Sequence, residues 1–519
     1  SITSVFETTN GSTTVTVNHT GHGANAGDFV TFSSTTAAVG GIAAATLDAE
    51  HEIISVPNSN QYTVVAGSAA TSDVTSGTAN CTAAYQIPIK REFSSPGAGW
   101  NAGPWNDSTW NTERETSVVI FAGGQWTFAN FGEDLLAWQQ NGKIYTWDTS
   151  GGMTSTNRAT AVSNAPTANR LGLMTAPDRH VVCFGTETTI GTTSTQDDLF
   201  VRWADQESST DWTPTATNTA GSQRLSGGSR IECALLAKQQ VLIWTDTTLF
   251  AMRFVGPPFT FGFSNLGTNC GTVGPHSAVD ISGVTYWMSK DSFFMYDGTV
   301  KKLPCTVEDY VFDDINLSQN NEVFAASNSK FNEVTWFYTT SDGSQIDRYV
   351  TYNYMEGLWY TGTMARTTWV DTGIYDLPYA TKYSATSTST ATPTVSGVTD
   401  GRSQLYKHES GVDDGDDAIT AYIESSDFDL GDGADMVAIR KMVPDFKSQA
   451  GTVNLQLKVR DYPYGTQTTK SANAVTTSTT KVDTRARGRQ AAIKIYSDAT
   501  SDNWRFGTLR MDIQPDGRR

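Results

Sequence analysis

The chain has 519 residues, a formal net charge of −18 and a mean hydropathy of −0.34. No uninterrupted apolar stretch approaches the roughly 18–20 residues that a helix needs to cross a bilayer, so we expect no membrane span. The 54 acidic side chains outnumber the 36 Lys and Arg, which argues against tight wrapping around nucleic acid, because phosphate neutralisation needs clustered cations. An acidic surface would let DNA slide past, but acidity also keeps an ordinary protein soluble, and we favour the solubility interpretation.

The length predicts roughly two to four domains with material for a large core. The chain begins with Ser1, and residues 1–11 lack the basic and apolar regions of a signal peptide, which predicts a fragment or a processed chain. The cysteines are scattered and show no C-x-x-C spacing, so we expect small buried hydrophobic side chains in a reducing compartment and no zinc site. They are Cys81, Cys183, Cys233, Cys270 and Cys305.

Abundant Ser, Thr and Gly, short apolar runs and frequent Gly, Asn and Asp punctuation predict an all-β chain. The exception is a short helix predicted over 307–317, with Thr306 as its N-cap and Asp309 three residues later. Sheets of an all-β chain of this length must hide their edges by sandwich, barrel or propeller closure.

Residues 1–90 are rich in Thr, Ser, Gly and Ala. Within them, 13–17 alternate between Val and Thr, and 61–65 form a second apolar run. Both patterns are typical of strands. We predict a small N-terminal β module with light packing.

Residues 91–418 carry a weak internal repeat of a strand, a tight turn and an aromatic strand. The first copy runs from 135 to 148 and turns at Asn141-Gly142. Units that cannot bury both faces alone are typical of propeller blades, so this region predicts a β-propeller of about six blades. The further copies cover 171–203, 234–252 and 278–298, followed by two looser ones at 334–352 and from Tyr383 to Lys407.

Residues 419–519 change to clean alternation of apolar and polar side chains, clearest at 453–459 and repeated at 492–495 and 509–513. Such alternation indicates sheets with one buried and one solvated face. We predict a C-terminal antiparallel sheet or sandwich that packs against the propeller or a neighbouring subunit.

Three segments could in principle bind a metal. His19 and His22 form an H-x-x-H pattern, but the flanking glycines favour a turn and no third ligand is near. The acidic loops 413–417 and 427–432 offer oxygen ligands for calcium without the spacing of an EF-hand, so solvated turns are favoured. We therefore assign no metal-binding residue.

The sequence gives little support for a catalytic site. A sialidase-type propeller would repeat Ser-x-Asp-x-Gly-x-x-Trp turns, and the nearest segment, 340–344, has other spacing and does not repeat. There is no G-x-S-x-G elbow and no phosphate-binding G-x-x-x-x-G-K motif. Acid and base catalysis needs paired carboxylates, but among 54 acidic residues many pairs arise by chance, so a pair alone does not identify a catalytic site. We predict a protein that is not an enzyme, with no catalytic residue, no cofactor-binding residue and no cofactor.

Two further features suggest contacts. Trp100, Trp105 and Trp110 recur every five residues, which suits a carbohydrate-binding surface or a subunit interface, and we favour interface or loop packing. The basic run 485–489 could meet an acidic neighbour or DNA phosphate, although a solvated strand end is favoured.

Several ordered segments resemble one known family. The most specific are IWTDTTL (243–249), VGPPFTFGF (255–263), NCGTVGP (269–275), YWM (286–288), YDG (296–298) and VFDDIN (311–316). Further matches are FGEDLL (131–136), DWTPTATNTAG (211–221), FDLGDG (428–433) and RARGR (485–489). In this order they resemble the tail stabilisation, or nozzle, proteins of podoviruses, the short-tailed bacteriophages.

The resemblance implies a structural subunit of the virion tail, assembled in the host cytoplasm into a hexameric ring below the portal and adaptor. Such a ring closes the tail after packaging and conducts DNA at ejection without binding it specifically. Implied partners are further copies of the chain, the tail adaptor, and tail fibres or spikes. The family has no catalytic residues to transfer, and its members carry a segment before the point where this chain begins. The alternative reading is a propeller glycan hydrolase or a carbohydrate-binding tail adhesin.

Overall fold

A computed structural model describes residues 2–22, 24, 29–76, 79–85, 93–96, 118–121, 125–152, 157, 159–176, 178–343, 345–373, 375–382, 404–415, 417–429 and 435–517. The chain forms two compact units. The first unit comprises Ser1–Pro275 and Leu317–Asn321, and the second comprises His276–Asn316 and Glu322–Arg519. Antiparallel strands dominate both, which confirms the all-β prediction. Across the described residues, no helix is long and apolar enough to span a membrane.

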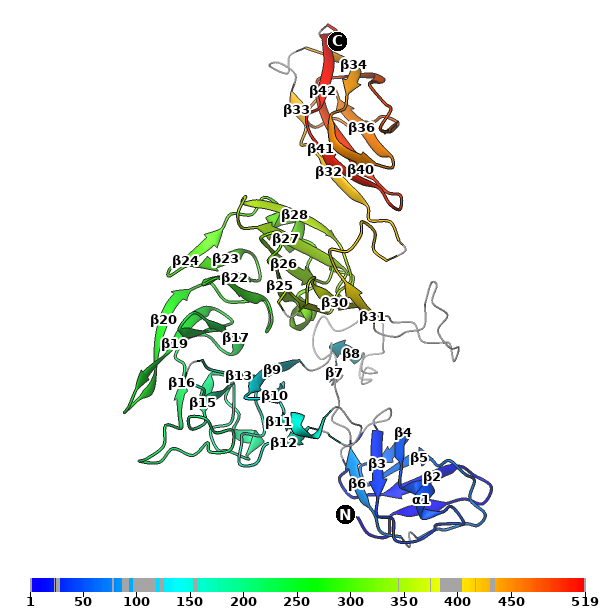
Figure 1. The fold of residues 1–519 in the computed structure, drawn as a ribbon, viewed down its shortest axis with the longest axis vertical. Coiled ribbons are helices and arrows are strands. Elements are labelled where there is room, and N and C mark those ends of the chain that lie inside the picture. Colours follow the sequence, from blue (N-terminus) through cyan, green and yellow to red (C-terminus); the bar gives the residue numbers. More distant parts are fainter. Residues whose placement is uncertain are drawn as a thin grey trace, which may run out of the picture. The chain divides into compact units, whose positions relative to one another are not determined.

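The first unit begins with a six-stranded sheet in the order β1-β2-β5-β4-β3-β6 (Figure 1). The strand predicted at 61–65 is present with those bounds, and the one predicted at 13–17 is displaced by one residue. The elements are β1 (Phe6–Thr8), β2 (Thr14–Asn18), β3 (Phe29–Ser33), α1 (Ala44–Leu47), β4 (Glu50–Asn58), β5 (Gln61–Val65) and β6 (Thr82–Tyr85).

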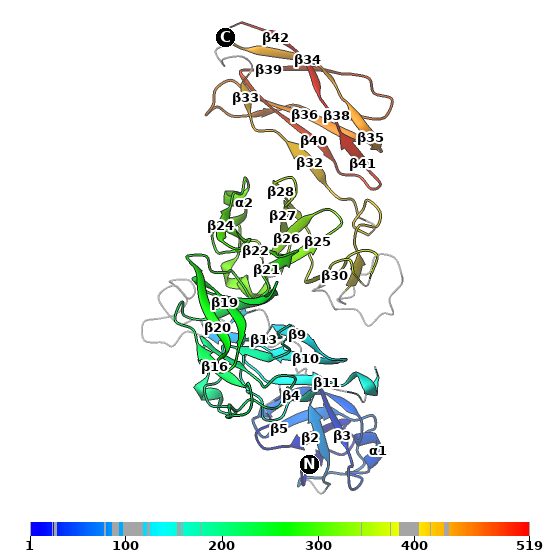
Figure 2. The ribbon, with the colours of Figure 1, turned by 60° about the vertical axis from the view of Figure 1, so that its left-hand side comes forward.

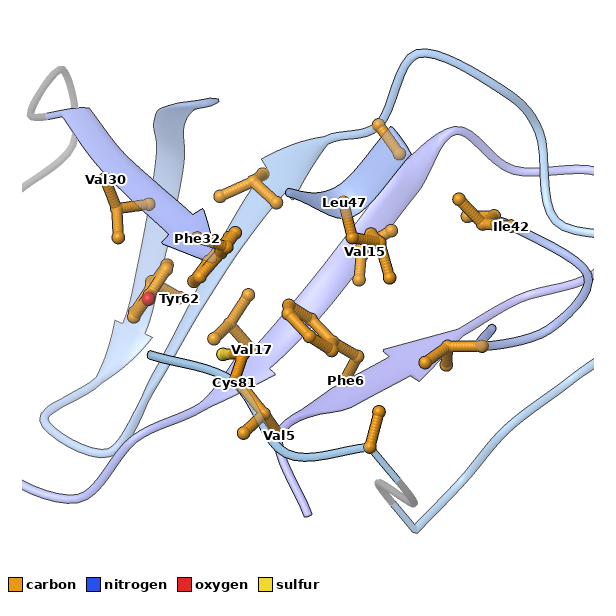
Figure 3. Packing of buried hydrophobic residues seen from close by; sticks show 14 of the residues in the cluster. Val5, Phe6, Val15, Val17, Val30, Phe32, Ile42, Leu47, Tyr62 and Cys81 are labelled. Atoms are coloured by element: carbon orange, nitrogen blue, oxygen red, sulfur yellow. The ribbon is translucent and has the colours of Figure 1, made fainter. Parts of the chain in front are cut away.

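The prediction of light packing in this module is wrong. Phe6 and Phe32 meet edge to face with ring centroids 5.0 Å apart, and both are almost completely buried. Figure 3 shows how Val15, Val17 and Tyr62 from neighbouring strands point into the same core. The abundant Thr and Ser of the segment lie mainly in turns and loops and at exposed or half-buried positions, so the composition of the segment hides a dense apolar interior.

Three four-stranded antiparallel meanders follow in the described part of the first unit: sheet I (β9–β12), sheet II (β13–β16) and sheet III (β17–β20). The first strands of the sheets lie side by side, with β13 between β9 and β17. A separate two-stranded ribbon pairs β7 (Phe93–Pro96) with β8 (Val118–Phe121). The strands of the three sheets are β9 (Trp126–Phe131), β10 (Asp134–Gln139), β11 (Ile144–Trp147), β12 (Thr160–Ala161), β13 (Leu171–Met174), β14 (Val181–Phe184), β15 (Phe200–Trp203), β16 (Gly221–Arg224), β17 (Ile231–Ala237), β18 (Gln240–Thr245), β19 (Thr248–Gly256) and β20 (Thr260–Thr268).

The second unit continues the series with sheet IV (β21–β24), sheet V (β25–β28) and the three-stranded sheet VI (β29–β31). Here too the first strands are neighbours, with β25 between β21 and β29. The strands are β21 (Ala278–Ile281), β22 (Val284–Met288), β23 (Phe293–Tyr296), β24 (Val300–Leu303), β25 (Phe324–Asn328), β26 (Glu333–Tyr338), β27 (Arg348–Asn353), β28 (Leu358–Thr363), β29 (Thr368–Val370), β30 (Tyr379–Lys382) and β31 (Gln404–Lys407).

A buried tryptophan on the second strand explains the aromatic signal of the repeat. It occurs in sheets I, III, IV and V, where the side chains are Trp138, Trp244, Trp287 and Trp336, all 0 % exposed. The residues opposite on the first strands are small, and they are Thr127, Cys233, Ala278 and Ala325. A large ring beside a small partner fills the space between sheets without overpacking, so the repeat has a steric basis.

The described part of the second unit ends in two sheets that enclose one core (Figure 2). One sheet is built on the path β32-β40-β36-β37 and the other has the order β39-β34-β42, with β35 and β41 forming a ribbon. The predicted alternation at 453–459 is confirmed, because buried and half-buried residues alternate along β36. The strands are β32 (Ala421–Glu424), β33 (Phe428–Asp429), β34 (Val437–Val443), β35 (Phe446–Ala450), β36 (Val453–Arg460), β37 (Thr468–Thr469), β38 (Asn473–Val475), β39 (Val482–Gly488), β40 (Gln490–Ser497), β41 (Asn503–Phe506) and β42 (Arg510–Pro515).

The helix predicted over 307–317 is much shorter. It is α2 (Glu308–Phe312), and its N-cap is Val307 without a side-chain hydrogen bond, so the predicted cap at Thr306 is wrong. The chain leaves the helix because Ile315 forms a β-bridge with Thr340. Pairing with a distant segment therefore overrides the local helical pattern.

Candidate functional site

A pocket of about 380 Å³ opens in the first unit where the β13–β14 turn meets sheet III. Its lining combines three amide side chains and one carboxylate with two phenylalanine rings. The lining residues are Thr175, Ala176, Asp178, Gln206, Leu236, Gln239, Gln240, Val241, Met252, Phe254 and Phe261.

Asp178 is the carboxylate of the pocket, and its side chain is only 9 % exposed. Its Oδ2 accepts a hydrogen bond from Thr175 Oγ1 at 2.7 Å and lies 3.1 Å from Nδ1 of His180. Because a carboxylate only accepts, the imidazole carries a proton on Nδ1. The tight turn between β13 and β14 thus holds the carboxylate in one orientation.

His180 lies behind the pocket wall with its side chain fully buried. Its Nε2 is 3.0 Å from Thr219 Oγ1, and Thr219 donates from N and Oγ1 to Asp205 at 2.8 and 2.6 Å. Burial lowers the pKa of His180, and the nearby Asp178 carboxylate opposes that effect. The network connects the β13–β14 turn to the segment between β15 and β16.

Two aromatic rings form the apolar wall. Phe261 meets His180 edge to face at 5.1 Å between centroids, and Phe254 lies 5.8 Å from Phe261. Phe254 is 46 % exposed, so its ring is available at the mouth. The arrangement offers an apolar surface directly beside fixed hydrogen-bonding groups.

The same hairpin continues into an exposed apolar tip, residues 254–259. Val255 is 58 % exposed and Phe259 is 76 % exposed, and Pro257 and Pro258 between them are exposed as well. A contiguous exposed apolar segment of this kind marks a contact site. Sequence reasoning used these residues only for the family resemblance and did not identify the tip.

The other ends of sheets II and III carry buried charges. Arg170, which precedes β13, contacts Glu232 of β17 at 3.2 Å and donates from Nε to Ile231 O at 2.9 Å. Glu232 also pairs with Arg230, and its side chain is 1 % exposed. Because each charge of this group faces an opposite charge of the chain itself, we interpret it as a clamp between the first strands of two sheets.

Glu187 is a second buried carboxylate of the first unit. It accepts hydrogen bonds from Thr167 Oγ1 and from the backbone N of Gly191, the latter at 2.7 Å. These donors hold the loop after β14, so we interpret Glu187 as part of the loop structure.

The H-x-x-H pattern joins an aromatic cluster. His19 Nδ1 lies 2.5 Å from the hydroxyl of Tyr85, which donates to Tyr62 at 2.9 Å. His22 Nδ1 accepts from Ala24 N at 3.0 Å. In the described part of the chain, no group of three or more His, Cys, Asp or Glu side chains could hold a metal ion. The two histidines stabilise the turn after β2, in line with the turn that the glycines predicted.

The acidic loop at 413–417 lies against a buried arginine. Arg366 donates to Asp414 at 2.9 Å and to His408 Nε2 at 2.9 Å, and its guanidinium lies 4.1 Å from the ring centre of Tyr406. Burial and then the Arg366 charge lower the pKa of His408 to about 4. We call Arg366, Tyr406, His408 and Asp414 the Arg366 cluster. It was not predicted, because its members are far apart in sequence and lack a common pattern.

The other sequence-predicted features have mixed outcomes. Trp100, Trp105 and Trp110 lie outside the described residues, as do 383–403, Asp416 and 430–434. In the basic run, Arg487 pairs with Asp516 at 2.6 Å and Arg489 lies over Tyr462. All five cysteines are free thiols, and all except Cys305 are buried, which confirms the packing role for four of them.

No family model matches the chain, and no curated protein matches it by sequence. Solved structures match at low identity. The phage phi92 endosialidase matches at 12 % identity and a TM-score of 0.17, over 65 % of this chain and 46 % of the endosialidase. An exo-beta-1,3-galactanase from Phanerochaete chrysosporium matches at 10 % identity and a TM-score of 0.24, over 81 % of this chain and 100 % of the galactanase. A family 32 glycoside hydrolase from Bifidobacterium adolescentis matches at 10 % identity and a TM-score of 0.21, over 99 % of each chain.

These matches contradict the prediction that the chain is not an enzyme, since glycoside hydrolases and an endosialidase recur among them. The prediction rested on missing linear motifs. A glycosidase typically needs two carboxylates held at a set separation in space, which the order of residues along a chain does not reveal. At identities of 10–12 % and TM-scores of 0.17–0.24, the matches assign no activity to this chain.

Proposed function

We propose that sheets I–VI are the blades of a six-bladed β-propeller and that the chain is a ring-forming subunit of a short-tailed phage tail nozzle. The propeller part is supported by first strands that are neighbours within each unit, β9, β13 and β17 in one and β21, β25 and β29 in the other, since adjoining first strands are the plan of a propeller. The flanking N-terminal module and C-terminal sandwich suit a subunit that contacts several partners.

The exposed tip carries the nozzle part of the proposal. The segment VGPPFTFGF is among the most specific of the resemblance to the nozzle family, and five of its nine residues, 255–259, lie in the tip, at the end of β19 and in the turn before β20. Core packing does not require Val255, Pro258 or Phe259, because their side chains face solvent. An apolar tip on a long hairpin supports insertion into a second copy of the chain, and head-to-tail contacts of this kind generate rings.

The ring conducts DNA past an acidic surface without specific binding, consistent with a net charge of −18. Its partners are further copies of the chain, the tail adaptor and tail fibres or spikes. Its location is the virion tail.

Native mass spectrometry of the full chain and proteomics of purified tails test the proposal. We expect a hexamer in solution and this chain in the tails. A double change, Val255→Ser with Phe259→Ser, should shift the hexamer to smaller species without unfolding, because both side chains are exposed. The control is Phe128→Ser, which alters another exposed ring, on β9 of sheet I. A wild-type protein that stays monomeric at all concentrations and is absent from tails would overturn the proposal.

A further inference from the structure

The pocket between the β13–β14 turn and sheet III is the strongest candidate for a second role, and Phe254 is the one residue that it shares with the exposed tip. We propose that it binds one pyranose residue of a glycan. The lining combines neutral polar groups with apolar rings, holds its carboxylate in place and contains no Lys or Arg.

The polar groups of the pocket suit a ligand with several hydroxyls. Asp178 offers acceptor oxygens, and the three glutamine side chains offer both donors and acceptors. Gln240 is oriented by Arg253, whose Nε donates to its Oε1 at 2.8 Å. Because each sugar hydroxyl both donates and accepts, a mixed set of amides and one carboxylate can satisfy several hydroxyls at once.

The apolar part of the pocket suits the C–H face of a sugar ring. Phe254 and Phe261 stand on the paired strands β19 and β20 and face each other in register. Phe254 presents an exposed ring at the mouth, and Met252 lies further along the same strand. One face of a pyranose is apolar, so it can lie against such rings while its rim of hydroxyls reaches the amides.

The carboxylate is positioned before any ligand arrives. Thr175 and His180 both contact Asp178 Oδ2, and on the other side of the imidazole Nε2 lies 3.0 Å from Thr219 Oγ1. Among the described residues, no hydrogen bond to the second oxygen, Oδ1, is found. A nearly buried carboxylate that is held through one oxygen retains its other oxygen for a ligand, at a small cost in ordering.

Other small ligands fit the lining less well. Among the lining residues there is no Lys or Arg, so an anion would find no countercharge. An ammonium could pair with Asp178, but it would leave the amides of Gln206 and Gln239 without a function. The balance of groups therefore favours a neutral polyhydroxylated ring over either ion.

Titration calorimetry and saturation-transfer NMR on the full chain test the proposal. The probes are the methyl glycosides of galactose, glucose and N-acetylglucosamine, with spermidine as the amine. We expect millimolar binding of at least one glycoside, weakened about tenfold or more by Asp178→Asn and by Phe254→Ala. Gln206→Ala should weaken it less, and Gln206 is exposed, so that variant keeps its fold.

Phe128→Ala is the matched control, because it removes an exposed ring outside the pocket and should leave binding unchanged. Failure of all three glycosides to bind, binding of spermidine alone, or glycoside binding that survives both Phe254→Ala and Gln206→Ala would overturn the proposal. Release of reducing ends from an oligosaccharide, lost in Asp178→Asn, would support it and add hydrolysis to binding. Native mass spectrometry measures ring assembly separately, so failure of the glycan proposal and failure of the nozzle proposal are distinguishable.

Discussion

Each compact unit holds a histidine beside a charged side chain, and the two charges are opposite: His180 is fully buried and faces a carboxylate, whereas His408 is half-buried and faces a guanidinium. In the first unit His180 faces the Asp178 carboxylate, and the network borders a pocket. In the second unit His408 accepts a hydrogen bond from the Arg366 guanidinium, inside a cluster that ties sheet VI to an acidic loop. Asp178 contacts His180 through one oxygen, so its other carboxylate oxygen remains an acceptor for a ligand. Arg366 instead donates to Nε2 of His408 and so occupies the acceptor nitrogen of that imidazole. The first arrangement suits binding and the second suits stability.

The largest expected effect comes from removing the cation of the Arg366 cluster. Arg366 is 2 % exposed, and Arg366→Met should lower the free energy of unfolding of the second unit by about 3 kcal/mol, because His408 and Asp414 lose their donor. Urea denaturation measures the change. In the same unit, Arg348 has a side chain 30 % exposed and contacts Asp314 only at 3.8 Å, so Arg348→Met should cost less than about 1 kcal/mol. If both variants lowered the free energy of unfolding by the same amount, the Arg366 cluster would stabilise the unit no more than a half-exposed ion pair does.

The next effect is a pH dependence. The pKa of His408 is about 4 in the fold against 6.5 in the unfolded chain, so the unfolded state binds more protons between these values. The contribution of neutral His408 to the free energy of unfolding is fully present above pH 6.5 and is lost as the pH falls through 4. The shift corresponds to about 3 kcal/mol, which solvent screening of a half-buried ring reduces to about 2 kcal/mol.

His408→Gln separates this effect from other titrations. The glutamine Oε1 can still accept from Arg366 but does not titrate. Denaturation at pH 7 and pH 4 gives the free energy of unfolding of both proteins. Between these two pH values it should fall by about 2 kcal/mol less in the variant than in the wild type. Parallel losses in the two proteins would mean that His408 does not control the acid response.

The smallest effect is expected in the first unit. Thr219→Val keeps the shape of the side chain but removes the hydroxyl that contacts His180, Asp205 and the backbone N of Gln206. We expect a loss of about 2 kcal/mol or less, because some of these groups can reach water. Thr217→Val, at an exposed position two residues earlier, should be close to neutral. Calorimetric unfolding compares the two, and a neutral Thr219→Val would show that the network does not stabilise the unit.

Much of the fold could be predicted from local patterns. Alternation at 453–459 identified β36, and the strand, turn and aromatic-strand repeat identified strands in all of sheets I–V. Asn141 has a φ of 54°, as the predicted Asn-Gly turn requires. These signals are visible because the period of a strand and the chemistry of a turn involve residues within a few positions of one another.

The candidate sites could not be predicted in the same way. His180 and Thr219 are 39 residues apart, and Arg366 and Asp414 are 48 apart. No periodicity links such pairs, and lone Asp, His and Thr residues in loops have many possible partners. The helix at 307–317 shows the same limit, because its local pattern gave way to the bridge between Ile315 and Thr340.

The sequence by itself therefore determined the all-β class of this protein, strands in each of sheets I–V and the Asn141-Gly142 turn, since these follow from side-chain alternation and backbone preference. Only the tertiary structure decided which charges are paired, which apolar residues stay exposed at the tip of the β19–β20 hairpin, and which polar groups converge on the pocket. Burial and long-range contact set those outcomes, because hydrogen bonding, pKa and exposure depend on neighbours in space, which the order of residues along the chain does not reveal.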